Sequence, residues 1–211
     1  MTPLVMFGAG HGFALKTLHA INAESPTWDL LGFVDDDPAK AGSELLGYPV
    51  LGDRSVLPKL LSANADLHVF NNVVGHWSKR RDVAELLADG GFEIASLIDP
   101  RIDVLDLHCG VGVFIGAFAN FGHSARLGDY AVIMQAVVLG DETEIGDYVF
   151  IANLANVGSR AVVGENTFVG PNSVVLLDRI VGPEAVVGAG AIIVSDVPAG
   201  AKMFSPPAQR R

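Results

Sequence analysis

Glycine and histidine residues near the start of the chain form its clearest candidate ligand site. The segment Gly8-Ala-Gly-His-Gly12 follows a short apolar run and precedes a stretch with helical character. Glycine allows the backbone to approach a ligand, and a helix N-terminus offers free N–H groups, so Gly8, Gly10 and His11 could hold a phosphate. A tight turn between a strand and a helix explains the same residues equally well. A nicotinamide dinucleotide fits less well, because its fingerprint has glycine where this chain has Phe13.

Two adjacent carboxylates form a second candidate. Asp35 and Asp36 follow the apolar run Leu30–Val34, at the place where a carboxylate of a Rossmann-type sheet meets ribose hydroxyls. A solvated loop or a helix cap is the alternative. Asn71-Asn72 and Arg80-Arg81 are further candidates for the same crevice, although a surface helix also accounts for two arginines.

Strands alternating with helices are predicted to position these residues. Apolar runs at 3–7, 30–34, 67–70 and 92–98 read as strands, and 13–22, 54–62 and 78–90 read as helices. This alternation predicts a parallel sheet of Rossmann type over residues 1–98. A connector over 99–108 follows.

The second half of the chain repeats every six residues. Fourteen successive positions from Ile115 to Ile193, spaced by six, are apolar, and glycine follows at ten of them. A short strand alternates its faces, so one aliphatic side chain per repeat can point into a narrow prism. Three repeats make one 18-residue coil, and the coils stack through strand hydrogen bonds. We therefore predict an all-β parallel β-helix over 109–194 and a C-terminal tail over 195–211, and we disfavour a sandwich, whose strands do not keep an unbroken step of six.

The composition excludes several classes of function. The net charge is −10, so nucleic acid is a poor partner. No run approaches the roughly 20 apolar residues of a membrane span, and the first residues do not resemble a signal peptide. The single cysteine, Cys109, excludes an internal disulfide and offers no metal cluster. We expect no metal and a cytoplasmic location.

The two halves together resemble a bacterial family of nucleotide-sugar acetyltransferases, of the sialic-acid O-acetyltransferase and bacillosamine or perosamine N-acetyltransferase type. The matching segments are Gly8–Gly12, Phe33–Asp36, Gly47–Gly52, Leu97–Pro100, Asp196–Gly200, Pro206–Ala208 and the repeats. The resemblance covers nearly the whole chain.

The resemblance implies an activity, a co-substrate and an assembly. The first domain would hold the nucleotide of a UDP-, GDP- or CMP-linked sugar, and the second would be a left-handed β-helix that forms a homotrimer. Acetyl-CoA would lie between subunits and pass its acetyl group directly to an amine or hydroxyl of the sugar, for surface glycan synthesis. The implied cofactor-binding residues are Phe150, Ser159, Gly188, Ala189 and Pro207.

The chain departs from that family at its catalytic segment. Aligned through Ile145 and Ile151, the position of the usual catalytic histidine is Asp141, its partner carboxylate is Glu142, and a second histidine is replaced by Phe150. A general base should have a pKa near the working pH, which imidazole has and an ordinary aspartate lacks. Asp141 could have a raised pKa beside Glu142, or it could hold an acceptor ammonium by charge.

His123 is the competing candidate for the base. It lies one full coil before Asp141, so the two should stack on one corner of the prism, where His123 could pair with Asp141 or replace it. A solvated turn residue is the alternative. Three interpretations follow: an active sugar acetyltransferase, a binding or structural protein that has lost the chemistry, or an enzyme with another acyl donor or acceptor.

Overall fold

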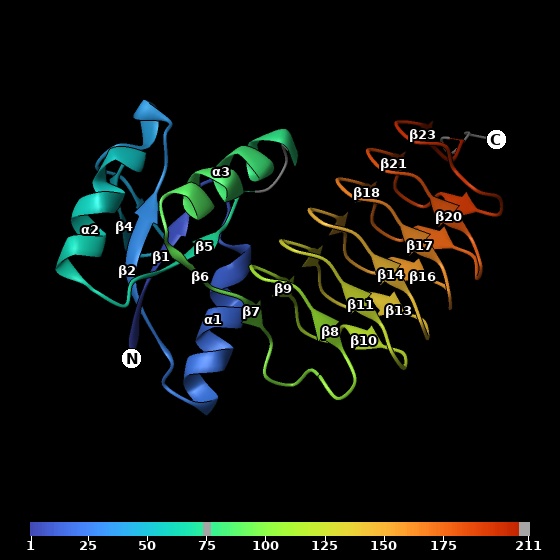
Figure 1. Cartoon of the computed structure of the whole chain (residues 1–211), viewed down its shortest axis with the longest axis horizontal. Helices are drawn as coiled ribbons and strands as arrows, with labels where there is room; N and C mark the ends of the chain where they lie inside the picture. The colour runs from blue at the N-terminus through green and yellow to red at the C-terminus, as the bar shows by residue number, and fades with distance from the viewer. Residues whose placement is uncertain (74–76, 207–211) are drawn as a thin grey trace, which may run out of the picture. The chain divides into compact units, whose positions relative to one another are not determined.

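The computed structural model describes residues 1–73 and 77–206, which form two compact units, Met1–Pro100 and Arg101–Arg211 (Figure 1). Each unit has its own buried core. The two kinds of sequence pattern therefore correspond to two kinds of architecture.

The first unit is built on a six-stranded sheet with helices around it (Figure 1). The strand order is β3-β4-β2-β1-β5-β6, and every neighbouring pair is parallel except β3 and β4, which form a hairpin. The strands are β1 (Thr2–Phe7), β2 (Trp28–Val34), β3 (Glu44–Leu45), β4 (Tyr48–Gly52), β5 (His68–Asn71) and β6 (Glu93–Ile94), with β7 (Leu97–Ile98) after them. The predicted parallel sheet is present, and the carboxyl ends of β1 and β2 lead into the two candidate ligand segments.

The helices of the first unit are α1 (Phe13–Glu24), α2 (Leu57–Ala63) and α3 (Trp77–Asp89). Val5 of β1 packs in one buried cluster with Leu57 of α2 and Leu87 of α3, whereas Leu4 alternates to the other face and is equally buried. Burial on both faces is typical of a parallel sheet. This packing fixes the ends of β1 and β2.

Two predicted elements of this unit are divided in the structure. The helix expected from residue 54 begins as a 3-10 turn, Arg54–Val56, and continues as α2. Pro58 fits in the first turn of α2 because the N–H groups there have no acceptor within the helix, so the missing N–H of proline costs no hydrogen bond. The strand expected over 92–98 is two short strands, β6 and β7. A second 3-10 turn, Pro38–Lys40, follows β2 and brings Lys40 back toward it.

The second unit is a parallel β-helix of two-residue strands (Figure 1). Each strand pairs with the equivalent strand of the next coil, and the repeat position is the second residue of each. The strands are β8 (His108–Cys109), β9 (Phe114–Ile115), β10 (Asn120–Phe121), β11 (Arg126–Leu127), β12 (Val132–Ile133), β13 (Val138–Leu139), β14 (Glu144–Ile145), β15 (Phe150–Ile151), β16 (Asn156–Val157), β17 (Val162–Val163), β18 (Phe168–Val169), β19 (Val174–Val175), β20 (Ile180–Val181), β21 (Val186–Val187), β22 (Ile192–Ile193) and β23 (Lys202–Met203). The parallel strands and the repeats fit a left-handed β-helix.

The repeat positions fill the prism as the pattern predicts. All of them from Ile115 to Ile193 are buried except Phe121, which is half-buried. Strand pairing also continues beyond residue 194: Val197 forms a bridge with Val181, and β23 pairs with β21. The segment predicted as a tail therefore begins with residues that extend the stack.

Glycine and the left-handed backbone occupy different positions of the repeat. A Cβ on Gly158 would lie 2.5 Å from the backbone nitrogen of Leu177 in the next coil, so this position excludes side chains by overlap. The positive φ falls two residues later, at Arg160 with φ 57°, and recurs every six residues on non-glycine residues from Phe118 to Glu184, with Gly112 and Gly190 at the same step. The glycines of the repeat therefore permit coil stacking and do not themselves make the left-handed turn.

Candidate functional site

A pocket of about 570 Å³ lies in the first unit, at the carboxyl ends of β1 and β2. All five residues predicted to bind substrate line it: Gly8, Gly10, His11, Asp35 and Asp36. The topology brings them together because parallel strands present their carboxyl ends at one edge of the sheet. The lining also includes three cationic side chains and two further carboxylates: Lys40, Arg54, Lys79, Asp37 and Asp82.

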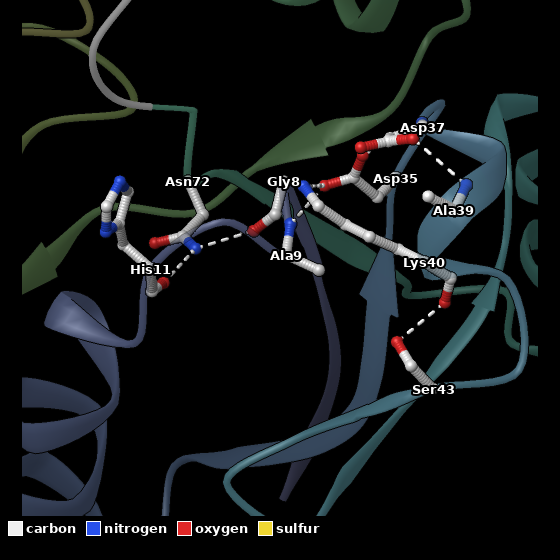
Figure 2. A network of polar contacts seen from close by, with 9 residues as sticks. All are labelled: Gly8, Ala9, His11, Asp35, Asp37, Ala39, Lys40, Ser43 and Asn72. Carbon is white, nitrogen blue, oxygen red and sulfur yellow. Dashed lines mark hydrogen bonds and ion pairs between the residues drawn. The ribbon is translucent and has the colours of Figure 1, made fainter.

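Asp35 holds the glycine-rich loop in place. Its Oδ2 accepts hydrogen bonds from the backbone N–H of Ala9, at 2.7 Å, and from Lys40 Nζ, at 2.6 Å (Figure 2). Burial raises the pKa of the Asp35 carboxyl, but the hydrogen bond from Lys40 and those from the backbone N–H groups of Asp37 and Ala9 bring that pKa below its ordinary value. Asp35 is therefore an ionised clamp between the loop and Lys40.

Asn72 fixes the other side of the loop. Its Nδ2 donates to the carbonyl oxygens of Gly8, at 2.7 Å, and of His11, at 2.9 Å (Figure 2). Gly8 has φ +109°, and a Cβ there would lie 3.1 Å from the backbone of Asn72, so the close approach needs glycine. The loop is therefore held from both sides by the protein itself.

Asp36 pairs with Arg54 at the rim of the pocket. Asp36 Oδ2 accepts from Arg54 Nε and Nη2, at 2.8 and 2.5 Å. The hydrogen bond from the Arg54 side chain is the main cause that lowers the pKa of Asp36. Both carboxylates of the predicted pair are ionised, and each has a cation beside it.

Sequence reasoning found only part of this pocket. Asn72 lines it as expected, but Arg80 is buried, at 2% exposure, and is not among the lining residues. Lys40, Arg54 and Lys79 were not predicted. The short spacing between the Asp35-Asp36 pair and Lys40 in the sequence is a signal that could have placed Lys40 in this pocket.

A second pocket, of about 410 Å³, lies on the β-helix. It contains two of the three predicted catalytic residues, His123 and Glu142, and not Asp141. The remaining lining comes from the turns and from the outer face of β11, β14 and β17: Ser124, Arg126, Glu144, Arg160 and Val162. The coil register explains the grouping, because Arg126, Glu144 and Val162 lie on three stacked strands.

His123 pairs with a carboxylate other than the expected one. Its Nδ1 lies 2.5 Å from Asp106 Oδ2, whereas Asp141 Oδ1 accepts the backbone N–H of His123 at 2.8 Å. The idea that the His123 ring pairs with Asp141 is therefore wrong. The ring turns toward the preceding coil, and the Asp141 carboxylate is directed at the backbone of the turn.

The role of Asp141 in its turn recurs along the β-helix. Asp129 Oδ1 accepts the backbone N–H of Val111 at 2.9 Å, and Asp147 Oδ1 accepts that of Asp129 at 2.8 Å. Each donor lies one coil before its acceptor. A carboxylate at this position joins adjacent coils, which is a structural task independent of chemistry.

The residues expected to contact a cofactor are spread over several coils. Phe150 stacks on Phe168, with ring centroids 5.7 Å apart, and Ser159 Oγ accepts the backbone N–H of Asp141 at 3.2 Å. Ala189 follows Gly188, and its carbonyl oxygen accepts a hydrogen bond from Ser205 at 3.0 Å. Pro207 lies outside the described residues. None of the four described residues lines either pocket.

Neither a membrane span nor a metal cluster is found among the described residues. No helix there combines the length and apolarity needed to cross a bilayer. Within the same residues, no three or more His, Cys, Asp or Glu side chains gather so as to hold a metal ion.

Comparison with known proteins identifies the architecture. The family model "Bacterial transferase hexapeptide (six repeats)" matches residues 142–177. A histidine-to-alanine variant of GDP-perosamine N-acetyl transferase from Caulobacter crescentus, solved with CoA and GDP-perosamine, is 26% identical, with a TM-score of 0.84 over 96% of this chain and 93% of that chain. The repeats of this chain are similar to those of bacterial hexapeptide transferases, and its fold is similar to that of this N-acetyltransferase over nearly the full length of both chains. The resemblance to hexapeptide-repeat acetyltransferases of the perosamine N-acetyltransferase type, which the sequence predicts, is thereby confirmed.

Two further structures support the same fold. The acetyltransferase domain of PglB from Neisseria gonorrhoeae is 25% identical, with a TM-score of 0.81 over 96% of each chain. WeeI from Acinetobacter baumannii, at 23% identity and a TM-score of 0.82 over 99% of each chain, shares the fold. A search of curated protein sequences finds no match. The likeness covers both units, so it extends to the unit that carries the glycine-rich loop.

Proposed function

We propose that this acyltransferase moves an acetyl group from acetyl-CoA to a nucleotide-linked sugar. The observation that carries the proposal is the pocket of Gly8, Asp35 and Asp36 in a chain whose fold matches, over nearly its full length, a transferase solved with CoA and GDP-perosamine. The first unit, residues 1–98 in the limits predicted from the sequence, is then a Rossmann-like nucleotide-sugar domain, and 109–194 is the acyl-transfer domain.

The chemistry of the first pocket suits a sugar nucleotide. Its volume of about 570 Å³ falls in the range of small-molecule sites. Backbone N–H groups of the loop and the ammonium of Lys79 can receive phosphate oxygens. Asp35 and Asp36 bring carboxylate oxygens to the same edge, where ribose hydroxyls can donate to them.

The proposed acyl donor is acetyl-CoA, with no metal in the reaction. By resemblance, Phe150, Ser159, Gly188, Ala189 and Pro207 contact it in a groove between subunits of a homotrimer. Stacking of Phe150 on Phe168 offers an apolar surface for such a contact. A role in surface glycan synthesis and a cytoplasmic location stay predictions.

The proposed acceptor site is the second pocket, where His123 and Glu142 lie together. The carboxylate of Glu142 suits an acceptor ammonium, and an imidazole suits the removal of a proton from the attacking group. Asp141, at the position of the usual histidine, is the alternative base.

One observation favours a second candidate function, that of a nucleotide-sugar-binding protein without turnover. The usual catalytic position holds Asp141 and not a histidine, and Oδ1 of its carboxylate already accepts a backbone N–H. The pocket of the first unit does not depend on that position and would bind its ligand in either case.

Release of free coenzyme A, followed with a thiol reagent, separates the two candidates. We would incubate the full chain with acetyl-CoA and UDP-, GDP-, CMP- and dTDP-linked amino sugars, and measure binding of each sugar nucleotide by calorimetry. Thiol release above the hydrolysis background with one sugar supports transfer. Binding of a sugar nucleotide with no release for any member of the panel would favour the binding protein.

A further inference from the structure

We propose that His123, positioned by Asp106, is the general base of the acetyl transfer, one coil away from the position that alignment assigns. This inference rests on the proposed acetyltransferase function and names the residues that perform its proton transfer. Asp106 touches neither reacting group in this account, so it is a positioning residue.

The pairing of the two side chains determines which ring nitrogen acts. His123 Nδ1 lies 2.5 Å from Asp106 Oδ2, a distance at which Nδ1–H donates to the carboxylate. A neutral imidazole with its proton on Nδ1 has an acceptor lone pair on Nε2. The carboxylate therefore selects the tautomer whose free nitrogen can take a proton.

Ser124 supplies the remaining contacts of the dyad. Its backbone N–H and its hydroxyl both donate to Asp106 Oδ2, at 2.8 and 3.1 Å, so the carboxylate is held from the turn next to His123. The hydroxyl oxygen also lies 3.2 Å from His123 Nε2. Once Nε2 is protonated, Ser124 Oγ can accept that hydrogen bond, and both N–H groups of the imidazolium then have oxygen acceptors.

Asp106 is in the charged form that this arrangement needs. The hydrogen bond from the Ser124 backbone N–H, together with that from its hydroxyl, brings the pKa of Asp106 below its ordinary value. The dyad lies on the surface, with 74% of the His123 side chain exposed, so an acceptor can reach it.

Asp141 is engaged elsewhere in the same turn. Its Oδ1 accepts the His123 backbone N–H, and the backbone N–H of Glu142 donates to the His123 carbonyl at 2.7 Å. These two bonds hold the turn of His123 against the following coil. Asp141 thus helps to place His123 through its Oδ1, and Asp141 is not among the residues that line the second pocket.

The transfer step balances with His123 as the base. The acceptor amine or hydroxyl attacks the thioester carbonyl carbon, and its proton passes to His123 Nε2. The new N–C or O–C bond forms and the C–S bond breaks. The imidazolium then returns the proton to the departing thiolate, which gives free coenzyme A and restores the neutral ring.

Steady-state kinetics with the acceptor found in the panel test the assignment. We expect His123→Ala and His123→Gln each to lower kcat about 100-fold or more with little change in KM, the usual size of a general-base contribution. Asp141→Asn, which keeps an acceptor oxygen for the turn, should lower kcat less than tenfold. His19→Ala, which removes an exposed imidazole on α1 of the first unit, serves as the matched control and should leave kcat unchanged.

The assignment would be overturned if the Asp141 variant lost more activity than the His123 variants. If His123→Ala turns over at the wild-type rate while Asp141→Asn loses activity, the base is Asp141 and the proposed acetyl transfer still stands. If the wild type itself transfers no acetyl group to any acceptor, the proposed function fails, and the base fails with it.

The role of Asp106 has a spectroscopic test that does not depend on turnover. Long-range ¹H–¹⁵N NMR spectra of the full chain should show neutral His123 with its proton on Nδ1. In Asp106→Asn the population of that tautomer should fall, kcat should fall with it, and KM should change little. A wild-type ring protonated on Nε2, or the same tautomer in both proteins, would contradict the positioning role.

Discussion

At the scale of single residues, an aspartate side chain has a different role in each of the two units. Asp35 is a half-buried clamp between a loop and Lys40, whereas Asp141 is an exposed acceptor for the backbone of the neighbouring coil. The sequence alone makes both residues candidates for a functional carboxylate. Only the direction of each carboxylate separates them, and direction is set by contacts between residues far apart in sequence.

The turn role of Asp141 can be measured as stability. We expect Asp141→Ala to lower the free energy of unfolding of the β-helix by about 1 kcal/mol relative to Asp141→Asn, because only Asn retains an oxygen for the His123 N–H. The same pair of substitutions at Asp129 is the matched control and should give a similar difference. Equal urea midpoints for Asp141→Ala and Asp141→Asn would count against the turn role.

The clamp of Asp35 predicts a pH dependence with a definite sign. Its folded-state pKa is below its ordinary value, so its contribution to stability is fully present above the unfolded pKa of about 3.9 and is lost as the pH falls through the folded value. The stability difference between wild type and Asp35→Asn should therefore be constant from about pH 6 to 8 and shrink below about pH 4. Urea titrations across this pH range measure the difference in unfolding free energy between the two proteins. An increase of that difference as the pH falls would contradict the predicted pH dependence.

At the scale of elements, the six-residue register predicts most of the second unit. Ile151 and Val169 are buried where the pattern puts them because one inward position per repeat leaves no alternative packing. The sequence does not reveal which repeat position carries the positive φ, because polar and apolar residues such as Glu142 and Leu154 both adopt it. It also misses β23, whose pairing with β21 falls outside the six-residue step.

The stacking role of the repeat glycines gives a prediction at this scale. Gly158→Ala should destabilise the β-helix by about 1–3 kcal/mol, the usual cost of overpacking, because the added Cβ overlaps the backbone of Leu177. Ala136→Gly, which places glycine at a left-handed position, should stay within about 1 kcal/mol of the wild type. Thermal unfolding of both variants checks the pair, and equal midpoints would contradict the stacking argument.

At the scale of the whole molecule, the chain combines a candidate ligand pocket in one unit with a β-helix of the acyltransferase type in the other. The candidate pocket was predictable for Gly8, Asp35 and Asp36 because local motifs mark strand ends. Lys79 and Arg54 were not, since they come from segments that only the sheet topology brings to that edge. The Asp106–His123 pair was missed for the same reason: the two residues lie on adjacent coils and in different positions of the repeat.

The proposed homotrimer has a simple test. Its particle should have three times the mass of the single chain, which is 22.1 kDa. Light scattering of the full chain at micromolar concentration should return that threefold mass, with or without coenzyme A. A particle with the mass of one chain would remove the proposed groove between subunits and the donor site within it.

Transfer of a ¹³C-labelled acetyl group from acetyl-CoA to a nucleotide-linked amino sugar tests the central claim most directly. The account predicts that mass spectrometry finds the labelled acetyl on the sugar nucleotide, with one equivalent of free coenzyme A for each product molecule. Label that stays on coenzyme A, or leaves it only as acetate, while the sugar nucleotide is bound and unchanged, would contradict the account.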